Sequence, residues 1–172
     1  MLFRSSHPIV ERAAHGHLPE WSSLGEKRRR HIERVAGLLD DWAVAGNLTP
    51  EERTRWIAAG YLHDALKEKP EQELRALLTG ADRELPEPVL HGPAVAALLR
   101  REGVTDEELL SALAHHTLGH PDLGRTGCAL YAADFLEPGR DLSNEWRASL
   151  RARMPGEMAA DRKSTRLNSS HT

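Results

Sequence analysis

Apolar side chains recur at every third or fourth position along most of this chain, which is the spacing of one face of an amphipathic helix. The clearest stretch runs from about residue 27 to residue 45, where Val35, Leu38 and Trp42 share one helical stripe. No run of four or more residues alternates between apolar and polar side chains with hairpin turns around it. The pattern therefore predicts an all-α fold in a single domain.

Capping residues and helix breakers indicate where these helices begin and end. Thr49, Pro50 and Glu52 form a capping box with proline at the first helical position. A second capping box is predicted at residues 105–108, and glycines end several of the helical stretches. After a short first helix opened by Pro8, the expected helices cover approximately residues 27–45, 50–63, 70–80, 93–102, 105–116, 124–135 and 143–154.

Histidine and aspartate side chains fall on the apolar side of several of these helices. His31 lies on the same stripe as Val35 and Trp42, whereas His115 falls on the polar side of its helix. A single inward histidine is usually a core residue, but a buried carboxylate without a partner is unfavourable. Imidazole and carboxylate groups are the ligands that bind zinc, iron or manganese. Because several such side chains converge in one small domain, they predict a metal site. The inward residues are His31, His63, Asp64, His116 and Asp134.

Length and composition agree with a soluble globular protein. The chain has 172 residues, of which 40% are hydrophobic and 28% charged, and this length suits one domain with its own core. No apolar run approaches the roughly 20 residues of a membrane span, and the N-terminus lacks the apolar stretch of a signal peptide. A single cysteine, Cys128, excludes an internal disulfide. We therefore expect a cytoplasmic protein without a membrane partner.

The last twelve residues, 161–172, differ in character from the rest of the chain. They read like the translation of a sequencing-library adapter and interrupt the helical pattern, so we interpret them as a non-native tail. On this interpretation the native C-terminus is missing. Without the three basic and one acidic side chains of this tail, the formal net charge of −3 becomes −5. A chain of this charge is not expected to bind nucleic acid.

The order of the inward residues, with His91 added between Asp64 and His116, resembles that of the HD-domain phosphohydrolase superfamily. Four short motifs narrow this resemblance, and they match over about residues 25 to 142. Together they are similar to those of the YqeK family, the symmetrical bis(5′-nucleosyl)-tetraphosphatases. The motifs are His63-Asp64-Ala-Leu-Lys67-Glu68, His91-Gly92-Pro93, His116-Thr117-Leu-Gly119 and Ala133-Asp134-Phe-Leu-Glu137-Pro138-Gly139-Arg140.

The resemblance implies an HD-domain helical bundle over residues 25–160, preceded by a helical extension over residues 1–24. It also implies a divalent metal, iron in the first place with manganese or zinc as alternatives. The implied metal ligands are His31, His63, Asp64 and Asp134. The implied catalytic residues are Asp64, His91, His116 and Lys67, of which His91 and His116 face a second metal or the substrate phosphates. The implied phosphate-binding residues are Arg28, Lys67, Gly92, Thr117 and Arg140.

The activity implied is symmetrical cleavage of diadenosine tetraphosphate into two ADP, by attack on phosphorus of a hydroxide generated at the metal. The residues themselves suit this chemistry. Lys67, one turn after Asp64, can meet a phosphate as a point charge, and Arg140 can do so with two N–H donors. The helix predicted to open at Gly92 and Pro93 offers free N–H groups to an anion. The expected partner is a dinucleoside polyphosphate or another nucleotide, and the resemblance also allows a homodimer.

Two departures from the family pattern leave alternatives open. His120 stands where the family usually has a basic residue, and the family chain continues with a further helix. Another HD-domain nucleotide phosphohydrolase would share the same chemistry. A non-catalytic nucleotide-sensing module is the main alternative from another class, although a sensor tolerates the loss of His63 or Asp64 and both are present here. A purely structural helical domain is disfavoured because five inward ligand-type side chains are unfavourable without a common partner.

Overall fold

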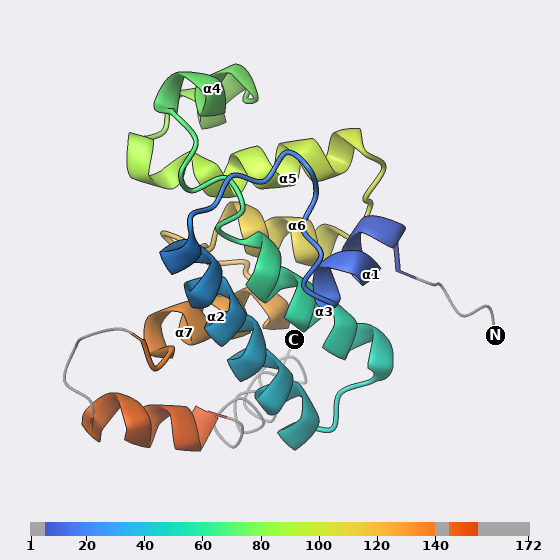
Figure 1. The fold of residues 1–172 in the computed structure, drawn as a ribbon, viewed down its shortest axis with the longest axis vertical. Helices are drawn as coiled ribbons and strands as arrows, with labels where there is room; N and C mark the ends of the chain where they lie inside the picture. The colour runs from blue at the N-terminus through green and yellow to red at the C-terminus, as the bar shows by residue number, and fades with distance from the viewer. Residues whose placement is uncertain (1–5, 140–144, 155–172) are drawn as a thin grey trace, which may run out of the picture.

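A computed structural model of the chain describes residues 6–139 and 145–154, and this part is helical, with no strand within those ranges (Figure 1). The predicted all-α fold is therefore confirmed. Two short 3₁₀ turns, η1 and η2, lie between the fourth and fifth α-helices. The elements are α1 (Pro8–Ala14), α2 (Glu26–Ala45), α3 (Pro50–Leu62), α4 (Glu71–Ala76), η1 (Gly80–Glu84), η2 (Glu87–Val89), α5 (His91–Arg101), α6 (Glu107–Ala114), α7 (Arg125–Leu136) and a further helix over residues 145–154.

Helix α3 lies at the centre of the fold and packs against α1, α2, α6 and α7 (Figure 1). Its closest approach is to α2 at Gly60, where a Cβ atom would lie only 2.6 Å from the Cα atom of Ala36. Helical glycine is intrinsically unfavourable, so its presence here is explained by this close contact of two backbones. The contact sets the spacing between α2 and α3, and these helices deliver His31 and His63 to one place.

The cap of α3 follows the sequence pattern. Thr49 Oγ1 accepts a hydrogen bond from the Glu52 backbone N–H at 3.2 Å, and the Glu52 carboxylate accepts one from the Thr49 N–H at 3.2 Å. The expected capping box has therefore formed. Its two reciprocal bonds satisfy backbone donors that the first turn of a helix otherwise leaves free.

The second predicted capping box is wrong. Asp106, not Thr105, caps α6 by accepting a hydrogen bond from the Leu109 N–H at 3.2 Å. Glu108 is unavailable because its carboxylate accepts from the backbone N–H and the hydroxyl of Thr126, at 3.1 and 2.8 Å. A long-range contact with the first turn of α7 has thus replaced the local one.

Three helix boundaries also differ from the predicted ones. The predicted helix over 70–80 is the shorter α4, ending at Ala76 and followed by a 3₁₀ turn. Helix α5 begins at His91, two residues before the predicted start, with Pro93 inside its first turn, where a missing N–H donor is harmless. Helix α6 ends at Ala114, so His116 lies just beyond it.

The N-terminal helix shares the core of the rest of the chain. Ile9, Val10 and Ala13 of α1 are buried and belong to the same apolar cluster as the residues of α2 to α7. The boundary predicted at residue 25 therefore separates segments that pack together, and it stays a prediction. Among the described helices, none combines the length and apolar character needed to cross a membrane.

Candidate metal centre

Five separate elements bring histidine and aspartate side chains to one point in the interior. Helix α2 contributes a histidine, and the end of α3 contributes the His-Asp doublet. The first residue of α5 and the segment after α6 each contribute one more histidine, and α7 contributes an aspartate. Burial is nearly complete for all but the last of them, which is partly exposed. The six residues are His31, His63, Asp64, His91, His116 and Asp134.

Asp64 presents its two carboxylate oxygens to two different pairs of histidines. Oδ2 lies 3.5 Å from the Nε2 atoms of both His31 and His63. Oδ1 lies 3.1 Å from Nε2 of His91 and 3.4 Å from Nε2 of His116. A single carboxylate is thus positioned between two groups of nitrogen ligands, which is the arrangement that a bridging ligand requires.

Asp134 completes the first of these two groups. Its Oδ1 atom lies 3.1 Å from Nε2 of His31 and 3.8 Å from Nε2 of His63. The predicted ligands His31, His63, Asp64 and Asp134 therefore surround one position. Asp64, His91 and His116 surround a second, with ligand atoms all within 4.8 Å of one another.

Hydrogen bonds at the other ring nitrogen orient these histidines. Nδ1 of His63 donates to the Gly60 carbonyl at 2.7 Å, and Nδ1 of His116 donates to the Leu113 carbonyl at 2.8 Å. A carbonyl acceptor fixes the proton on Nδ1, so Nε2 carries the lone pair that binds a metal. Within the described part of the chain, the buried Nε2 atoms of His31 and His63 have no hydrogen-bond partner. These orphaned nitrogens beside carboxylate oxygens fit a divalent cation.

The electrostatics of the cluster point to the same conclusion. Burial alone lowers the pKa of His63, but the Asp64 and Asp134 carboxylates outweigh it and raise that pKa to about 9. Burial likewise opposes ionisation of Asp64, but His63, His116 and His91 hold its pKa well below the usual range. The carboxylates are therefore ionised, and they attract a positive charge that a proton on His63 supplies when no metal does.

Glu137 contacts the cluster, although sequence reasoning gave it no role. Its carboxylate is only 2% exposed and accepts a hydrogen bond from Nδ1 of His31 at 3.2 Å. It also accepts from Nε of Arg34 at 2.6 Å and from the Gly139 N–H at 2.7 Å. Such an outer carboxylate fixes the orientation of a metal-binding imidazole. The signal in the sequence was an acidic residue one turn after Asp134, at the end of its helix.

A cavity of about 270 Å³ opens beside the cluster. Three of the predicted phosphate-binding residues line it, and Arg28 ion-pairs with Asp64 through Nη1 and Oδ2 at 3.0 Å. The aromatic rings of Tyr131 and Phe135, each more than 40% exposed, also line it, and sequence reasoning gave them no role. The lining residues are Arg28, Asp64, Lys67, His91, His116, Thr117, Tyr131, Asp134 and Phe135.

Of the two remaining predicted phosphate-binding residues, Gly92 alone belongs to the described part of the chain. Gly92 is buried against the end of α6, where a Cβ atom would lie 2.6 Å from the Leu113 carbonyl oxygen, and it is not part of the cavity wall. Its visible role is to allow α5 and α6 to approach each other, so that a phosphate contact there stays a prediction. Arg140 lies outside the described residues. His120 lies beside His115, with ring centroids 4.6 Å apart, and not in the cavity wall.

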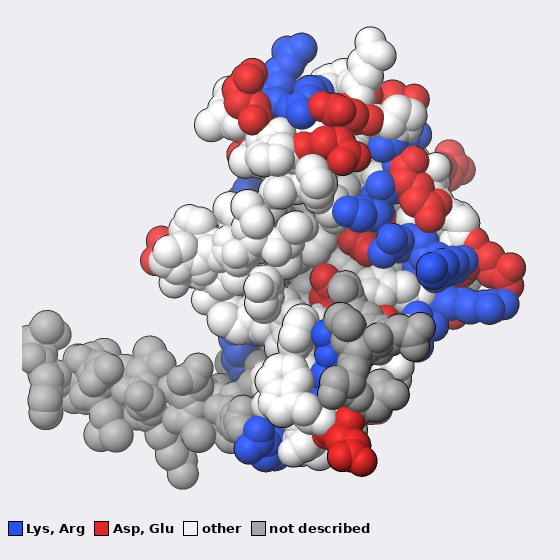
Figure 2. All heavy atoms as spheres, turned by 90° about the vertical axis from the view of Figure 1, so that its left-hand side faces the viewer, with Lys and Arg blue, Asp and Glu red and all other residues white. Residues whose placement is uncertain are grey.

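The charges at the surface are mixed. On the face shown in Figure 2, the described Lys and Arg side chains lie among Asp and Glu side chains and form no extended patch of one sign. An extended basic patch is the usual footprint of a nucleic-acid interface. This face therefore lacks that footprint.

Comparisons with known proteins give a consistent set of matches. The HD domain family matches residues 28–146. The symmetrical bis(5′-nucleosyl)-tetraphosphatase of Staphylococcus aureus is 34% identical over 125 residues, covering 69% of this chain and 63% of that protein. The protein of the same name from Bacillus subtilis is 34% identical over 119 residues, covering 64% of this chain and 62% of that protein. The chain thus spans slightly less than two thirds of the length of these two relatives.

Two further matches extend this set. A probable nicotinate-nucleotide adenylyltransferase/Ap4A hydrolase of Mycoplasma pneumoniae is 32% identical over 126 residues, which cover 72% of this chain and 36% of that protein. Among solved structures, a predicted HD superfamily hydrolase involved in NAD metabolism from Clostridium acetobutylicum has a TM-score of 0.65 and 28% identity. The match covers 78% of this chain and 72% of the chain of the Clostridium acetobutylicum protein.

Proposed function

Because the chain belongs to the HD-domain family, we propose that it is a metal-dependent hydrolase that cleaves diadenosine tetraphosphate symmetrically into two ADP. The names of the aligned tetraphosphatases support the substrate and agree with the resemblance to the YqeK family. The observation that carries the hydrolase proposal is the position of Asp64 between two pairs of histidines. A two-metal hydrolase holds its ions about 3.5–4 Å apart, and a carboxylate between two groups of nitrogen ligands suits such a pair.

In this proposal two groups of residues hold the metal. His31, His63, Asp64 and Asp134 would hold one divalent cation, and Asp64 with His91 and His116 would hold a second. Such cations would supply an activated water, whose pKa they lower toward about 7, and would screen the phosphate charges. Iron is the metal we propose first, and manganese or zinc would accept the same nitrogen and oxygen ligands.

The chain's own residues position the tetraphosphate. Arg28 and Lys67 both line the cavity. Their side chains are cations, and cations bind phosphate oxygens. Thr117 offers a hydroxyl from the same wall. We assign Gly92 and Arg140 to the phosphates on the family pattern alone. Lys67 and Arg140 then stabilise the charge on the leaving ADP.

His91 and His116 orient the reacting groups. Their Nε2 atoms lie 3.0 Å apart at the wall of the cavity, and burial lowers the pKa of His91. Each Nε2 atom has one lone pair, which would hold the second cation or, where that position is empty, accept a hydrogen bond from the attacking water. This assigns both residues to catalysis together with Asp64 and Lys67.

The aromatic rings beside the centre provide a place for a nucleoside. Tyr131 and Phe135 are one helical turn apart on α7, on either side of Asp134 in the sequence, and both face the cavity. Exposed rings next to a phosphate site suit the stacking of a purine, which contributes about 1–3 kcal/mol per base. We therefore place one adenine of the substrate against these two rings.

Cellular context and organisation are part of the same proposal. We propose a cytoplasmic enzyme without a nucleic-acid partner, with residues 25–160 as its HD domain and a homodimer as its assembly. The proposed non-native tail, residues 161–172, lies outside the described residues, so its assignment rests on the sequence alone.

Product analysis tests the function directly. The purified chain is incubated with diadenosine tetraphosphate and Fe²⁺ or Mn²⁺, and the nucleotides are separated by ion-exchange chromatography. ADP as the sole product would support the proposal. AMP with ATP would keep a phosphohydrolase but reject symmetrical cleavage. Bound metal and bound nucleotide with no product would favour the nucleotide-sensing module instead.

A further inference from the structure

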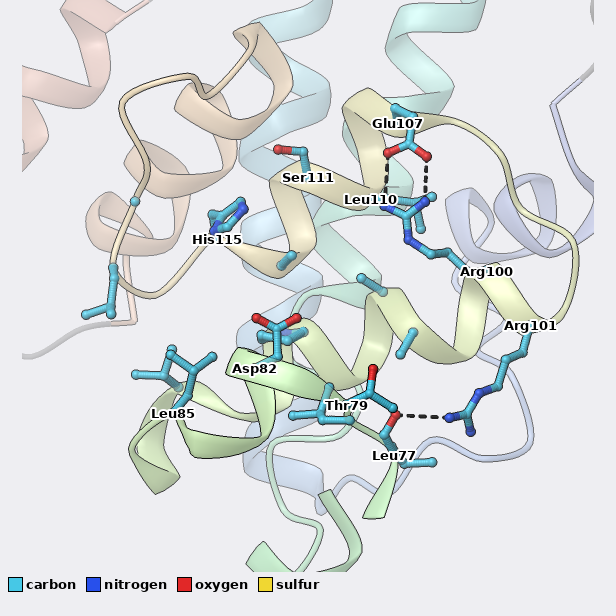
Figure 3. Close-up of a pocket in the computed structure, with 18 residues that line it drawn as sticks. Leu77, Thr79, Asp82, Leu85, Arg100, Arg101, Glu107, Leu110, Ser111 and His115 are labelled. Carbon is cyan, nitrogen blue, oxygen red and sulfur yellow. Dashed lines mark hydrogen bonds and ion pairs between the residues drawn. The ribbon is translucent and has the colours of Figure 1, made fainter. Parts of the chain in front are cut away.

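A second and larger cavity, of about 780 Å³, lies between α5, α6 and the η1–η2 segment (Figure 3). Small-molecule sites in proteins commonly measure roughly 300–1,000 Å³ and have mainly apolar walls with a few polar groups. This cavity falls in that range of volume, and its wall combines apolar side chains with several polar ones. Its walls include Leu85, Pro93, Ala97, Leu110 and Leu118.

The second cavity adjoins the metal cavity across one segment of chain. His116 and Thr117 line the metal cavity, whereas Leu118 and Gly119, which follow directly, line the second one. Two residues span at most about 7 Å, so the two cavities lie on either side of this short segment, and a ligand that reaches both must cross over it. Helix α5 shows the same division, because His91 faces the first cavity and Pro93 the second.

Besides its arginines, the second cavity has several polar groups in its wall. Asp82 and His115 point toward one another across the opening, and the Ser111 hydroxyl lies on the α6 side (Figure 3). A carboxylate can accept hydrogen bonds from an exocyclic amino group, and a hydroxyl can meet a ring nitrogen. The polar groups are thus of the kind that recognise the edge of a purine ring.

The cations of this cavity are already engaged by the protein. Arg100 forms two hydrogen bonds with the Glu107 carboxylate, the second at 2.9 Å, and Arg101 donates to the Leu77 carbonyl at 3.0 Å (Figure 3). The metal cavity has Lys67 in its wall, together with Arg28, which is paired with Asp64 at 3.0 Å. The second cavity therefore suits an uncharged part of a ligand and not its phosphates.

We propose that the second cavity binds the second adenine of a dinucleoside tetraphosphate whose first adenine lies against Tyr131 and Phe135. Two phosphates and a ribose separate the central bridging oxygen from each base, which is enough chain to pass Thr117. This inference rests on the proposed function. It predicts that the protein recognises a nucleoside on each side of the bond that is cleaved.

The test compares ligands with one and two bases. The probes are adenosine 5′-tetraphosphate and the non-hydrolysable diadenosine tetraphosphate with a central methylene bridge, and their Kd values are measured by calorimetry on the Mn²⁺-loaded protein. Ala97→Phe places a ring in the second cavity. Ala45→Phe, at the exposed end of α2, is the matched control. Melting temperature and metal content verify that each variant is folded.

We expect Ala97→Phe to weaken the two-base ligand about tenfold and the one-base ligand no more than twofold. Leu118→Ala tests the same site without disturbing the core, because Leu118 is 69% exposed. It should weaken the two-base ligand about threefold. Unchanged affinity in both variants, or equal weakening of the two ligands, would overturn the inference.

Failure of the proposed function would be recognised separately. If the wild-type chain does not cleave diadenosine tetraphosphate but Ala97→Phe weakens only the two-base ligand, the binding site stands without the activity. If the wild-type chain produces ADP and Ala97→Phe leaves both affinities unchanged, the activity stands without this site.

Discussion

Glu137 accepts a hydrogen bond from the imidazole of His31 at 3.2 Å, across 106 positions of sequence. Arg34, on the same helix as His31, holds the other oxygen of this carboxylate at 2.6 Å. Helix α2 and the end of α7 are thereby connected directly behind the metal ligand. The orientation of His31 depends on a residue that does not itself touch the metal position.

The first prediction concerns this hydrogen bond. Glu137→Gln removes the charge that stabilises the Nδ1 proton of His31, and we expect metal affinity to fall about 10- to 100-fold, as is typical for outer-sphere partners. The measurement is a competitive titration with a metal-binding dye. Glu33→Gln, an exposed position on α2, is the control and should leave affinity unchanged. Wild-type affinity in Glu137→Gln would show that His31 needs no such support.

A second prediction follows from the shared position of Asp64. Because both metal positions use this carboxylate, Asp64→Ala should remove bound metal from both and abolish turnover. Metal content is measured by mass spectrometry beside the product assay. Asp41→Ala, an exposed site on α2, should retain both properties. Full metal content together with activity in Asp64→Ala would refute the assignment of the centre.

The pH dependence of the metal-free protein provides a third prediction. The pKa of His63 is raised to about 9 by Asp64 and Asp134, above its usual value of 6.5. The stabilisation from protonated His63 is therefore complete below pH 6.5 and is lost as the pH rises through 9. We expect the melting temperature of the chelator-treated protein to decrease between pH 7 and 9.5, measured by circular dichroism.

Bound metal should suppress that decrease, because a cation replaces the proton and binding at pH 7.5 releases it. Calorimetry in buffers of different ionisation enthalpy would detect the release. A metal-free protein that becomes more stable over this pH range would contradict the protonation of His63.

Gly60 permits a fourth prediction with an internal control. A methyl group there would lie 2.6 Å from a backbone atom of Ala36, so Gly60→Ala should lower the free energy of unfolding by about 1–3 kcal/mol through overpacking. Gly37, on the facing helix, has nothing within 4 Å of its Cβ position. Gly37→Ala should therefore raise stability by about 0.5–1 kcal/mol. Urea denaturation measures both, and similar effects of the two substitutions would refute the close contact.

Lys67 carries the fifth prediction. It lines the metal cavity, so Lys67→Met should reduce kcat/KM for diadenosine tetraphosphate by about 10- to 100-fold through the loss of a phosphate contact. Lys69→Met is the matched control, because Lys69 pairs with Glu73 at 3.4 Å and is not part of the cavity wall. Equal losses in both variants would indicate a general effect of charge instead of a contact at the site.

The helical fold and the inward position of the histidines could be predicted because they depend on local periodicity. His31 and His63 fall on apolar stripes, and a helix with such a stripe must bury it. Contacts between distant segments could not be predicted in this way. Glu108 was assigned to the cap of its own helix, but it binds Thr126 of α7, and no local pattern distinguishes the two uses.

The same limit applies to the surroundings of the metal ligands. Glu137 directly follows α7, where the local sequence indicates only the end of a helix. Its partners His31 and Arg34 belong to α2, which is distant in the sequence. The second cavity likewise depends on how the η1–η2 segment lies over α5 and α6, which periodicity within each helix does not specify.

The convergence of five elements on one point makes a cation at the centre a cross-link of the tertiary structure. Helices α2 and α7, the ends of α3 and α6 and the start of α5 would all be tied to one ion or a pair of ions. A ligand that binds only the folded chain stabilises it by mass action, so thermal stability becomes a function of free metal concentration. Starvation for metal would then remove this protein from the cell by unfolding and proteolysis as well as by loss of catalysis.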